Sequence, residues 1–119
     1  APSCAKGHQG FLSATQMRWY WDQYAPRDLR RDPRASVAEA EIPACLAPAT
    51  IITAGHDPLH DEGVAYADAL TKAGLAAALH DYPAAIHGFA SLIGMVPLAD
   101  EAVDKACLAL QSAFAEGMI

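Results

Sequence analysis

The second half of the chain carries the clearest pattern of apolar and polar positions. A short apolar run rich in β-branched residues, Ala49 to Ala54, shows no alternation, which is typical of a strand buried on both faces of a parallel sheet. Helical spacing of apolar residues follows over Glu62 to Ala73. Asp61 is the expected N-cap of this helix, and Gly74 is its expected terminator.

A second strand and a second helix come next in the same order. The strand is predicted over Ala76 to Tyr82 and stops at Pro83. The helix is predicted over about Ala99 to Glu116, with an apolar stripe formed by Val103, Ala106, Cys107, Leu110 and Phe114. This order predicts one right-handed βαβ unit with a covering helix, and therefore the α/β fold class.

The first half contains one predicted helix and a long irregular stretch. Ser13 and Gln16 fit a capping box at the start of a helix over Ala14 to Tyr24, and Pro26 lies just beyond its end. Its aromatic residues lie on more than one face, which predicts either core packing or the lining of a substrate pocket. Residues 27–48 are expected to be irregular.

Composition limits the size of the unit and the kind of partner. With 119 residues there is room for one domain, and 53% hydrophobic with 18% charged residues is a globular composition. The net charge of −6 argues against nucleic acid or an anionic membrane as the main partner. No apolar run approaches the roughly 20 residues needed to span a bilayer.

The cysteines and residues 1–10 give information on the cellular location of the protein. Residues 1–10 are expected to form a loop and have no apolar core of the kind that a signal peptide carries. Cys4, Cys45 and Cys107 are an odd number without a CxxC spacing, which predicts reduced, mostly buried thiols. The expected location is therefore cytoplasmic.

Asp57 and His87 are the residues with the most specific chemical potential. Each comes after a predicted strand, and sites in open α/β sheets form at the carboxyl ends of strands. The helix between them travels back roughly 18 Å and the second strand returns roughly 20 Å. Both loops should therefore end at one edge of the sheet, where neighbouring strands lie about 4.8 Å apart.

An aspartate beside a histidine has a known catalytic use. The carboxylate fixes the histidine tautomer, and the imidazole takes a proton from a serine hydroxyl. In α/β hydrolases the chain order is serine, acid, histidine, and the order of Asp57 and His87 agrees with it. Taken singly, an aspartate before Pro58 is often a turn former and a histidine before Gly88 a plain loop residue.

A metal site is a rival interpretation of the first loop. Four potential ligands, His56, Asp57, His60 and Asp61, fall within six residues, and histidines four apart can bind zinc on a helix. Pro58 opposes a helix between them, and no cysteine or further acid is placed to complete the shell. We therefore expect no metal.

Longer motifs give the chain a family resemblance. The segment ATIITAGHDPLHDEGVAYADALTKAG and, after it, DYPAAIHGF resemble the C-terminal region of the hormone-sensitive-lipase family of α/β-hydrolase esterases. The earlier MRWYWDQY and DPRAS segments resemble the same family, so the likeness covers roughly residues 11 to 116. Each motif alone is weak, whereas their order and spacing together are specific.

The resemblance implies roles for particular residues. The aspartate of D-P-L-x-D-E-G and the histidine of I-H-G-F complete a Ser-Asp-His triad, and they match Asp57 and His87. The aromatic helix belongs to a cap over the active site, which makes Trp19 and Trp21 candidate substrate-binding residues, and Phe89 of I-H-G-F is a third candidate beside His87. The implied reaction is hydrolysis of short to medium acyl esters through an acyl-enzyme, with no metal and no organic cofactor.

Two family segments do not occur in this sequence. There is no GxSxG motif for the nucleophile and no HGGG segment for the oxyanion hole. We therefore expect the chain to be the C-terminal portion of an α/β-hydrolase fold, with the last two parallel strands and their helices in residues 49–119. Residues 1–48 would be a cap-region helix and its connecting loop. The alternative is a non-catalytic pseudoenzyme or interaction module.

The expected partners depend on that assignment. The N-terminal half of the same enzyme should carry the GxSxG serine and the oxyanion hole, and a small ester should be the substrate. The chain alone is expected to be inactive. The resemblance also allows two copies to pair along the last strand as a homodimer.

Overall fold

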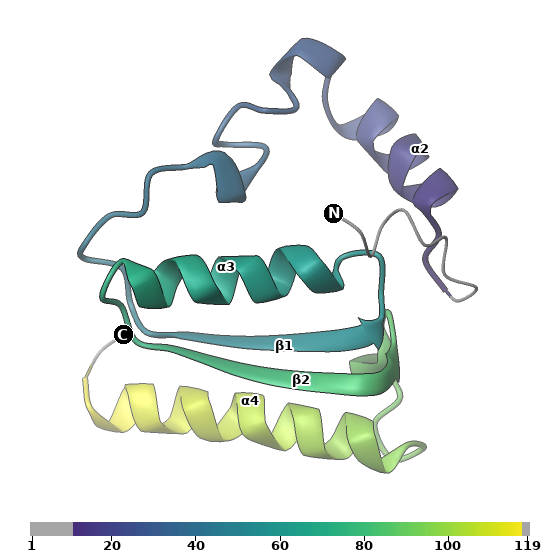
Figure 1. Cartoon of the computed structure of the whole chain (residues 1–119). Coiled ribbons are helices and arrows are strands. Elements are labelled where there is room, and N and C mark those ends of the chain that lie inside the picture. Colours follow the sequence, from purple (N-terminus) through teal and green to yellow (C-terminus); the bar gives the residue numbers. More distant parts are fainter. Residues whose placement is uncertain (1–10, 118–119) are drawn as a thin grey trace.

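The computed structural model of the chain describes residues 11–117 as two strands between two helices, with a further helix set apart (Figure 1). The helices and strands are α2 (Ala14–Tyr24), β1 (Ala49–His56), α3 (His60–Lys72), β2 (Ala77–Ile86) and α4 (Pro97–Ala115). Three single 3₁₀ turns lie between them, at Arg27–Leu29, Val37–Glu39 and Phe89–Ser91. The predicted loop over residues 1–10 lies outside the described residues.

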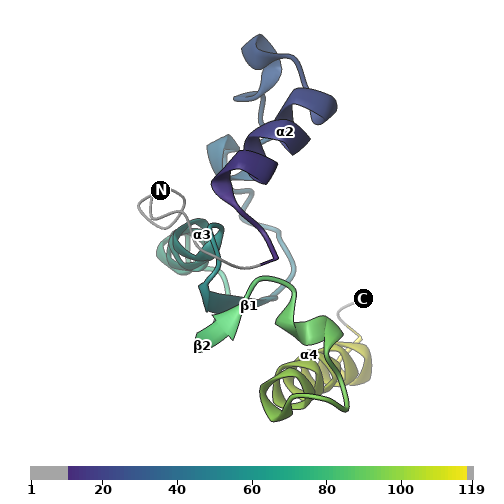
Figure 2. The same cartoon turned by 90° about the vertical axis from the view of Figure 1, so that its right-hand side faces the viewer.

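The two strands are parallel neighbours, as the sequence predicts. Their register runs in step from Ala49 beside Ala77 to Ala54 beside Tyr82. Helix α3 covers one face of this pair and α4 covers the other, which Figure 2 shows along the strands. The αβα layers confirm the α/β fold class.

The core between the sheet and α4 is built largely from small residues. Ala99 and Ala102 of α4 are fully buried, and they share a cluster with the buried Ala54 on β1. Two aromatic rings, Tyr82 and Phe89, complete this cluster with their centroids 5.2 Å apart. Alanines let α4 approach the strands closely, so the large rings fill the remaining space.

Helix α2 begins as the sequence predicts and packs little. The Ser13 hydroxyl accepts a hydrogen bond from the Gln16 N–H at 3.2 Å, and the Gln16 side chain accepts from the Ser13 N–H at 2.8 Å. This reciprocal pair confirms the capping box. No residue of α2 is buried, and the helix stands apart from the three layers in both views.

The predicted limits of the other elements need correction. Strand β1 continues through His56, and β2 passes Pro83 to end at Ile86. Pro83 is tolerated because it falls at an irregularity of the pairing, where no ladder hydrogen bond is required of it. Asp61 is not the N-cap of α3: Leu59 holds that position without a side-chain hydrogen bond, and Asp61 lies inside the first turn.

The last helix starts earlier than predicted. It begins at Pro97, which suits the first turn because its missing N–H would have no helical acceptor there. Within the described chain Leu110 and Phe114 of the predicted stripe are 53% and 65% exposed, and Leu110 lines a groove beside Pro48 and Thr50. Both described cysteines, Cys45 and Cys107, are exposed, which corrects the expectation of buried thiols.

The predicted glycine terminator Gly74 is confirmed by its backbone conformation. Gly74 after α3 has φ of 81°, which is the left-handed region that favours glycine, and Gly117 after α4 has a similar φ of 68°. The helices of residues 11–117 include none with the length and apolar character that crossing a membrane requires.

Candidate active site

A change of register at the end of the sheet sets the site. Up to Ala54 each residue of β1 pairs with the residue 28 positions later, as in Ala54 beside Tyr82. Beyond the irregularity the offset is 30, because His56 pairs with Ile86. The next pair at that offset is Asp57 with His87. Two extra residues in β2 therefore place His87 opposite Asp57. Without them Asp57 would lie opposite Ala85.

This irregularity depends on the absence of a side chain at Gly55. A Cβ atom built there would lie 2.3 Å from the Pro83 carbonyl oxygen and 2.7 Å from its Cα. The two backbones therefore approach more closely than any other residue type permits. Pro83 itself has no N–H to leave unpaired, so it fits the bulged segment.

Asp57 and His87 meet in a direct contact. Asp57 Oδ2 lies 2.8 Å from His87 Nδ1, the distance of a charge-assisted hydrogen bond. The Asp57 side chain is 14% exposed and the His87 side chain 37% exposed. The predicted hydrogen-bond distance between them is confirmed.

The Asp57 carboxylate is held on its other side by the backbone. The Leu59 N–H donates to Asp57 Oδ1 at 2.8 Å, and the His60 N–H donates to the Asp57 carbonyl at 3.1 Å. Pro58, between them, is almost completely buried. Each carboxylate oxygen thus has its own donor, which fixes the rotation of the group.

The position of His87 is fixed by the turn on its C-terminal side. Gly88 has φ of 76°, and this left-handed residue turns the chain into the Phe89–Ser91 turn. Phe89 is 7% exposed and packs on Tyr82 in the core beneath α4. The imidazole therefore projects from a short turn that is anchored on both sides.

The pair can act as a general base. A carboxylate only accepts hydrogen bonds, so Nδ1 of His87 carries the proton in this contact. The lone pair of the neutral ring is then on Nε2, which can take a proton from a nucleophile. Among residues 11–117 the ring has Asp57 as its one hydrogen-bond partner, and the His87 side chain is partly exposed.

The three candidate substrate-binding residues lie in different surroundings. Trp19 is 58% exposed on α2, while Trp21 lines a shallow aromatic groove with Met17, Tyr20, Gln23 and Tyr24. Phe89 comes two residues after His87 in the chain, but its ring is buried, and core packing accounts for that position. A substrate role for these residues stays a prediction.

The four residues of the rival metal interpretation have diverging partners. Asp57 bonds to His87, whereas His60 reaches Asp61 Oδ1 at 3.0 Å and Asp81 Oδ1 at 3.2 Å. No group of three or more histidine, cysteine or acidic residues within the described part of the chain is placed to hold a metal ion. Asp81 lies in β2, and nothing in the local sequence pattern predicts that it reaches His60.

Comparison with known proteins agrees with this geometry. Residues 2–91 match the family described as the alpha/beta hydrolase fold, which is most of the chain. The chain belongs to the α/β hydrolase fold family. Its two strands, the helices that cover them and the Asp57–His87 pair lie within or directly beside the matched segment.

Relatives of this α/β hydrolase chain are esterases. It is 39% identical over 113 residues to ethyl acetate hydrolase of Pseudomonas putida, covering 92% of this chain and 35% of that protein. It is 37% identical over 95 residues to esterase LipI of Mycobacterium tuberculosis, covering 79% of this chain and 29% of that one. The chain thus spans about a third of the length of the curated relatives it matches.

Solved structures give the same result. A hyperthermophilic esterase from the archaeon Pyrobaculum calidifontis matches with a TM-score of 0.88 and 32% identity, over 94% of this chain and 38% of that one. An α/β hydrolase enzyme from the metagenome of Lake Arreo, Spain, matches with a TM-score of 0.87 and 39% identity, over 97% and 37%. At this identity the likeness reaches beyond the fold to an esterase family.

Proposed function

We propose that this chain supplies the acid, Asp57, and the base, His87, of a Ser-Asp-His triad in a carboxylic-ester hydrolase. The nucleophilic serine and the oxyanion hole come from sequence outside these 119 residues. That sequence corresponds to the N-terminal half of the hormone-sensitive-lipase esterases that the chain resembles. The reaction passes through an acyl-enzyme and uses no metal or organic cofactor.

One observation carries the proposal. Asp57 Oδ2 lies 2.8 Å from His87 Nδ1 at the carboxyl ends of two adjacent parallel strands. That edge is where open α/β sheets place their sites. The contact holds the His87 ring with Nε2 available, as proton transfer from serine requires.

The likeness to esterases selects the reaction class. The Pseudomonas putida relative is named an ethyl acetate hydrolase, so a short ester is the first substrate to test. The groove formed by Met17, Tyr20, Trp21, Gln23 and Tyr24 has an almost wholly apolar lining and suits an acyl chain. We assign it to a cap over the site, as the family resemblance implies.

The open reading frame that contains this chain provides the first test. A GxSxG segment continuous with Ala1 is expected upstream, and the whole encoded protein should hydrolyse short-chain p-nitrophenyl esters. A fluorophosphonate probe should label the serine of that segment, as detected by mass spectrometry. The His87→Asn variant should lose at least about 10³-fold in turnover.

A matched control separates chemistry from folding. His80 lies on β2, the strand that leads to His87, so His80→Asn makes an identical substitution seven residues before the site. It should leave turnover within a fewfold of the unsubstituted protein. Equal activity in the two variants would contradict the triad. A frame that starts near Ala1 and encodes no nucleophile would instead favour a non-catalytic interaction module.

A further inference from the structure

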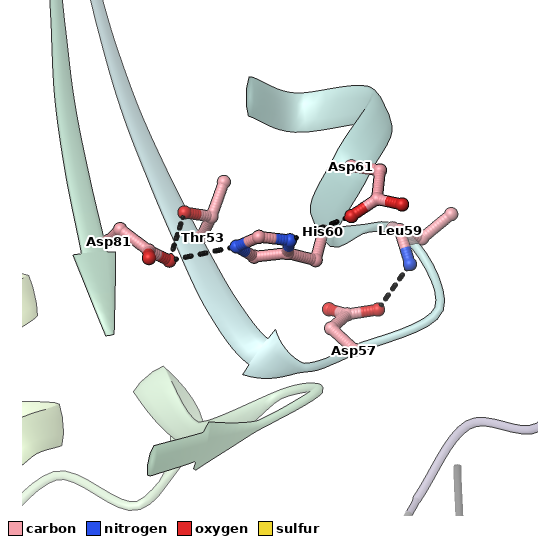
Figure 3. Close-up of polar contacts among 6 residues, drawn as sticks. All are labelled: Thr53, Asp57, Leu59, His60, Asp61 and Asp81. Carbon is pink, nitrogen blue, oxygen red and sulfur yellow. Dashed lines mark hydrogen bonds and ion pairs between the residues drawn. The ribbon is translucent and has the colours of Figure 1, made fainter. Parts of the chain in front are cut away.

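A second histidine lies beside the proposed triad with carboxylates at both ends of its ring. His60 Nδ1 is 3.0 Å from Asp61 Oδ1, and Nε2 is 3.2 Å from Asp81 Oδ1 (Figure 3). The same Asp81 oxygen accepts a hydrogen bond from Thr53 Oγ1 at 2.8 Å. The imidazole thus spans from the first turn of α3 to β2, over the β1 residue that pairs with Asp81.

The two contacts define the protonation state of the ring. A carboxylate oxygen only accepts, and a neutral imidazole has a single N–H, so it can satisfy one of the two contacts. Both are satisfied at once only by the imidazolium. The hydrogen bond to Asp61 is the main cause that raises the pKa of His60 above 6.5, burial opposes it, and the charge of Asp81 adds to it.

We propose that protonated His60 is a positioning residue, a cationic clamp that ties the first turn of α3 to β2 and thereby holds the Asp57 loop in place. The clamp is closed when both carboxylates are engaged. It opens when the ring loses its second proton and releases one of them. Its effect on catalysis rests on the proposed function, because it acts through Asp57.

The chain connects the clamp directly to the acid. His60 is three residues after Asp57, and its backbone N–H donates to the Asp57 carbonyl at 3.1 Å. The Leu59 N–H, adjacent to it, holds Asp57 Oδ1 at 2.8 Å. A shift of the first turn of α3 therefore moves a donor of the catalytic carboxylate.

The first turns of α3 pack closely against β1, so loss of the clamp would let this end of the helix move away from the strands. A Cβ atom at Gly63 would lie 2.8 Å from Thr53 Cγ2, so the first turns of α3 sit directly on β1. At this close approach the His60 side chain of α3 reaches Asp81 on β2. Loss of the clamp removes the side-chain tie that holds the helix end down across the strands.

The groups that face His60 favour the cation. Asp61 belongs to its own helix, Asp81 to β2 and the neutral Thr53 hydroxyl to β1. Asp57 and Glu62 line the same pocket of about 360 Å³ as His60. These ionisable groups are all acidic, and the contacts to Asp61 and Asp81 favour the charged form of the ring.

The pH dependence of the clamp has a definite sign. The stabilisation from a histidine with a raised pKa is fully present below 6.5, its unperturbed value, and is lost as pH rises through the folded-state value. Ordinary base catalysis by His87 runs in the other direction, since a general base must be deprotonated to act. Loss of the clamp should therefore lower activity and stability together on the alkaline side.

The first test measures the ring itself in the whole encoded protein. An NMR titration of the imidazole resonances should place the midpoint of His60 above 6.5 in the folded protein, and Asp81→Asn should lower it. A midpoint at or below 6.5, unmoved by Asp81→Asn, would overturn the clamp. This readout needs no turnover, so it stands even if the ester-hydrolase proposal fails.

The second test uses variants that differ in charge. His60→Gln should lower the melting temperature below pH 6.5 and flatten its decline at alkaline pH, whereas His60→Arg, which keeps the cation, should retain the stability at all pH values. His80→Gln is the matched control and should behave like the unsubstituted protein. Equal melting curves for His60→Gln and the control would overturn the proposal.

The third test asks whether the clamp acts on catalysis. In a protein that hydrolyses esters, His60→Gln should reduce kcat by on the order of tenfold to 10²-fold with a smaller change in KM, and His60→Arg should restore it. A loss that Arg does not restore, with an unchanged pH profile, would show a merely structural residue. Absence of hydrolysis in the unsubstituted protein would instead reject the proposed function.

Discussion

A Cβ atom at Gly55 would lie 2.3 Å from the carbonyl oxygen of Pro83, so β1 and β2 meet there backbone to backbone. This approach coincides with the step in register from an offset of 28 to one of 30. The step is what aligns Asp57 with His87 rather than with Ala85. A residue with no side chain thus controls a contact between two residues further along the strands.

Gly55→Ala should separate the pair. The new methyl group must push the bulged segment away, at a cost of about 1–3 kcal/mol of unfolding free energy. A displacement of about 1 Å at the triad should lower turnover of the whole protein by on the order of 10²-fold. Turnover and urea unfolding of the purified variant measure the two effects.

Gly74→Ala is the control for that substitution. Gly74 has φ of 81° with open space around its Cβ position, so alanine costs about 1–2 kcal/mol through backbone strain alone. It lies at the far end of α3 from the site. Its folded form should keep nearly full turnover. Equal loss of activity in the two glycine variants would mean that the register step does not position the triad.

Asp57→Asn should lower turnover of the whole protein by on the order of 10⁴-fold. An asparagine amide can donate to His87 Nδ1 and so favours the tautomer with its proton on the wrong nitrogen. Steady-state hydrolysis of a p-nitrophenyl ester measures the loss. Asp61→Asn, four residues on, should cost no more than about 10²-fold. If the two effects were reversed, Asp61 and not Asp57 would be the acid.

Trp21→Ala should change acyl-chain preference more than stability. Trp21 lines the groove of α2, which has no buried residues, so truncation removes little core packing. The ratio of kcat/KM for long and short p-nitrophenyl esters should shift by about tenfold, in line with one or two methylenes of apolar contact. Trp19→Ala, at a more exposed position, should shift it less. A fall in melting temperature with an unchanged ratio would leave only a packing role.

Residues 1–119 expressed alone should be inactive and should not unfold cooperatively. Each strand of the described sheet has one neighbour, and Leu110 and Phe114 of α4 are more than half exposed. Parallel sheets need cover on both faces and more than two strands for independent stability. Circular dichroism during heating and gel filtration test this. A soluble monomer with a sharp transition would favour an independent interaction module.

The sequence alone determined the order of the strands and helices and the proximity of Asp57 and His87. The unalternating apolar run of β1, the capping box at Ser13 and the glycine stops are local signals that depend on few neighbours. The spacing of Asp57 and His87 along the chain predicted that they lie close together in space. The helix between them runs back along the sheet by about the length over which the next strand returns. For these reasons the parallel pairing and the 2.8 Å contact could be predicted.

Only the tertiary structure decided the details that hold the pair in place. β2 continues past Pro83 because this residue falls in the bulge of β2 against β1, and the periodicity of one strand does not record where a bulge occurs. Asp61 fits a capping pattern, but the helix starts one residue before it, and its carboxylate bonds to His60. Asp81 meets His60 across 21 residues of sequence. Such contacts depend on how closely α3 sits on the strands, and local propensity does not encode that distance.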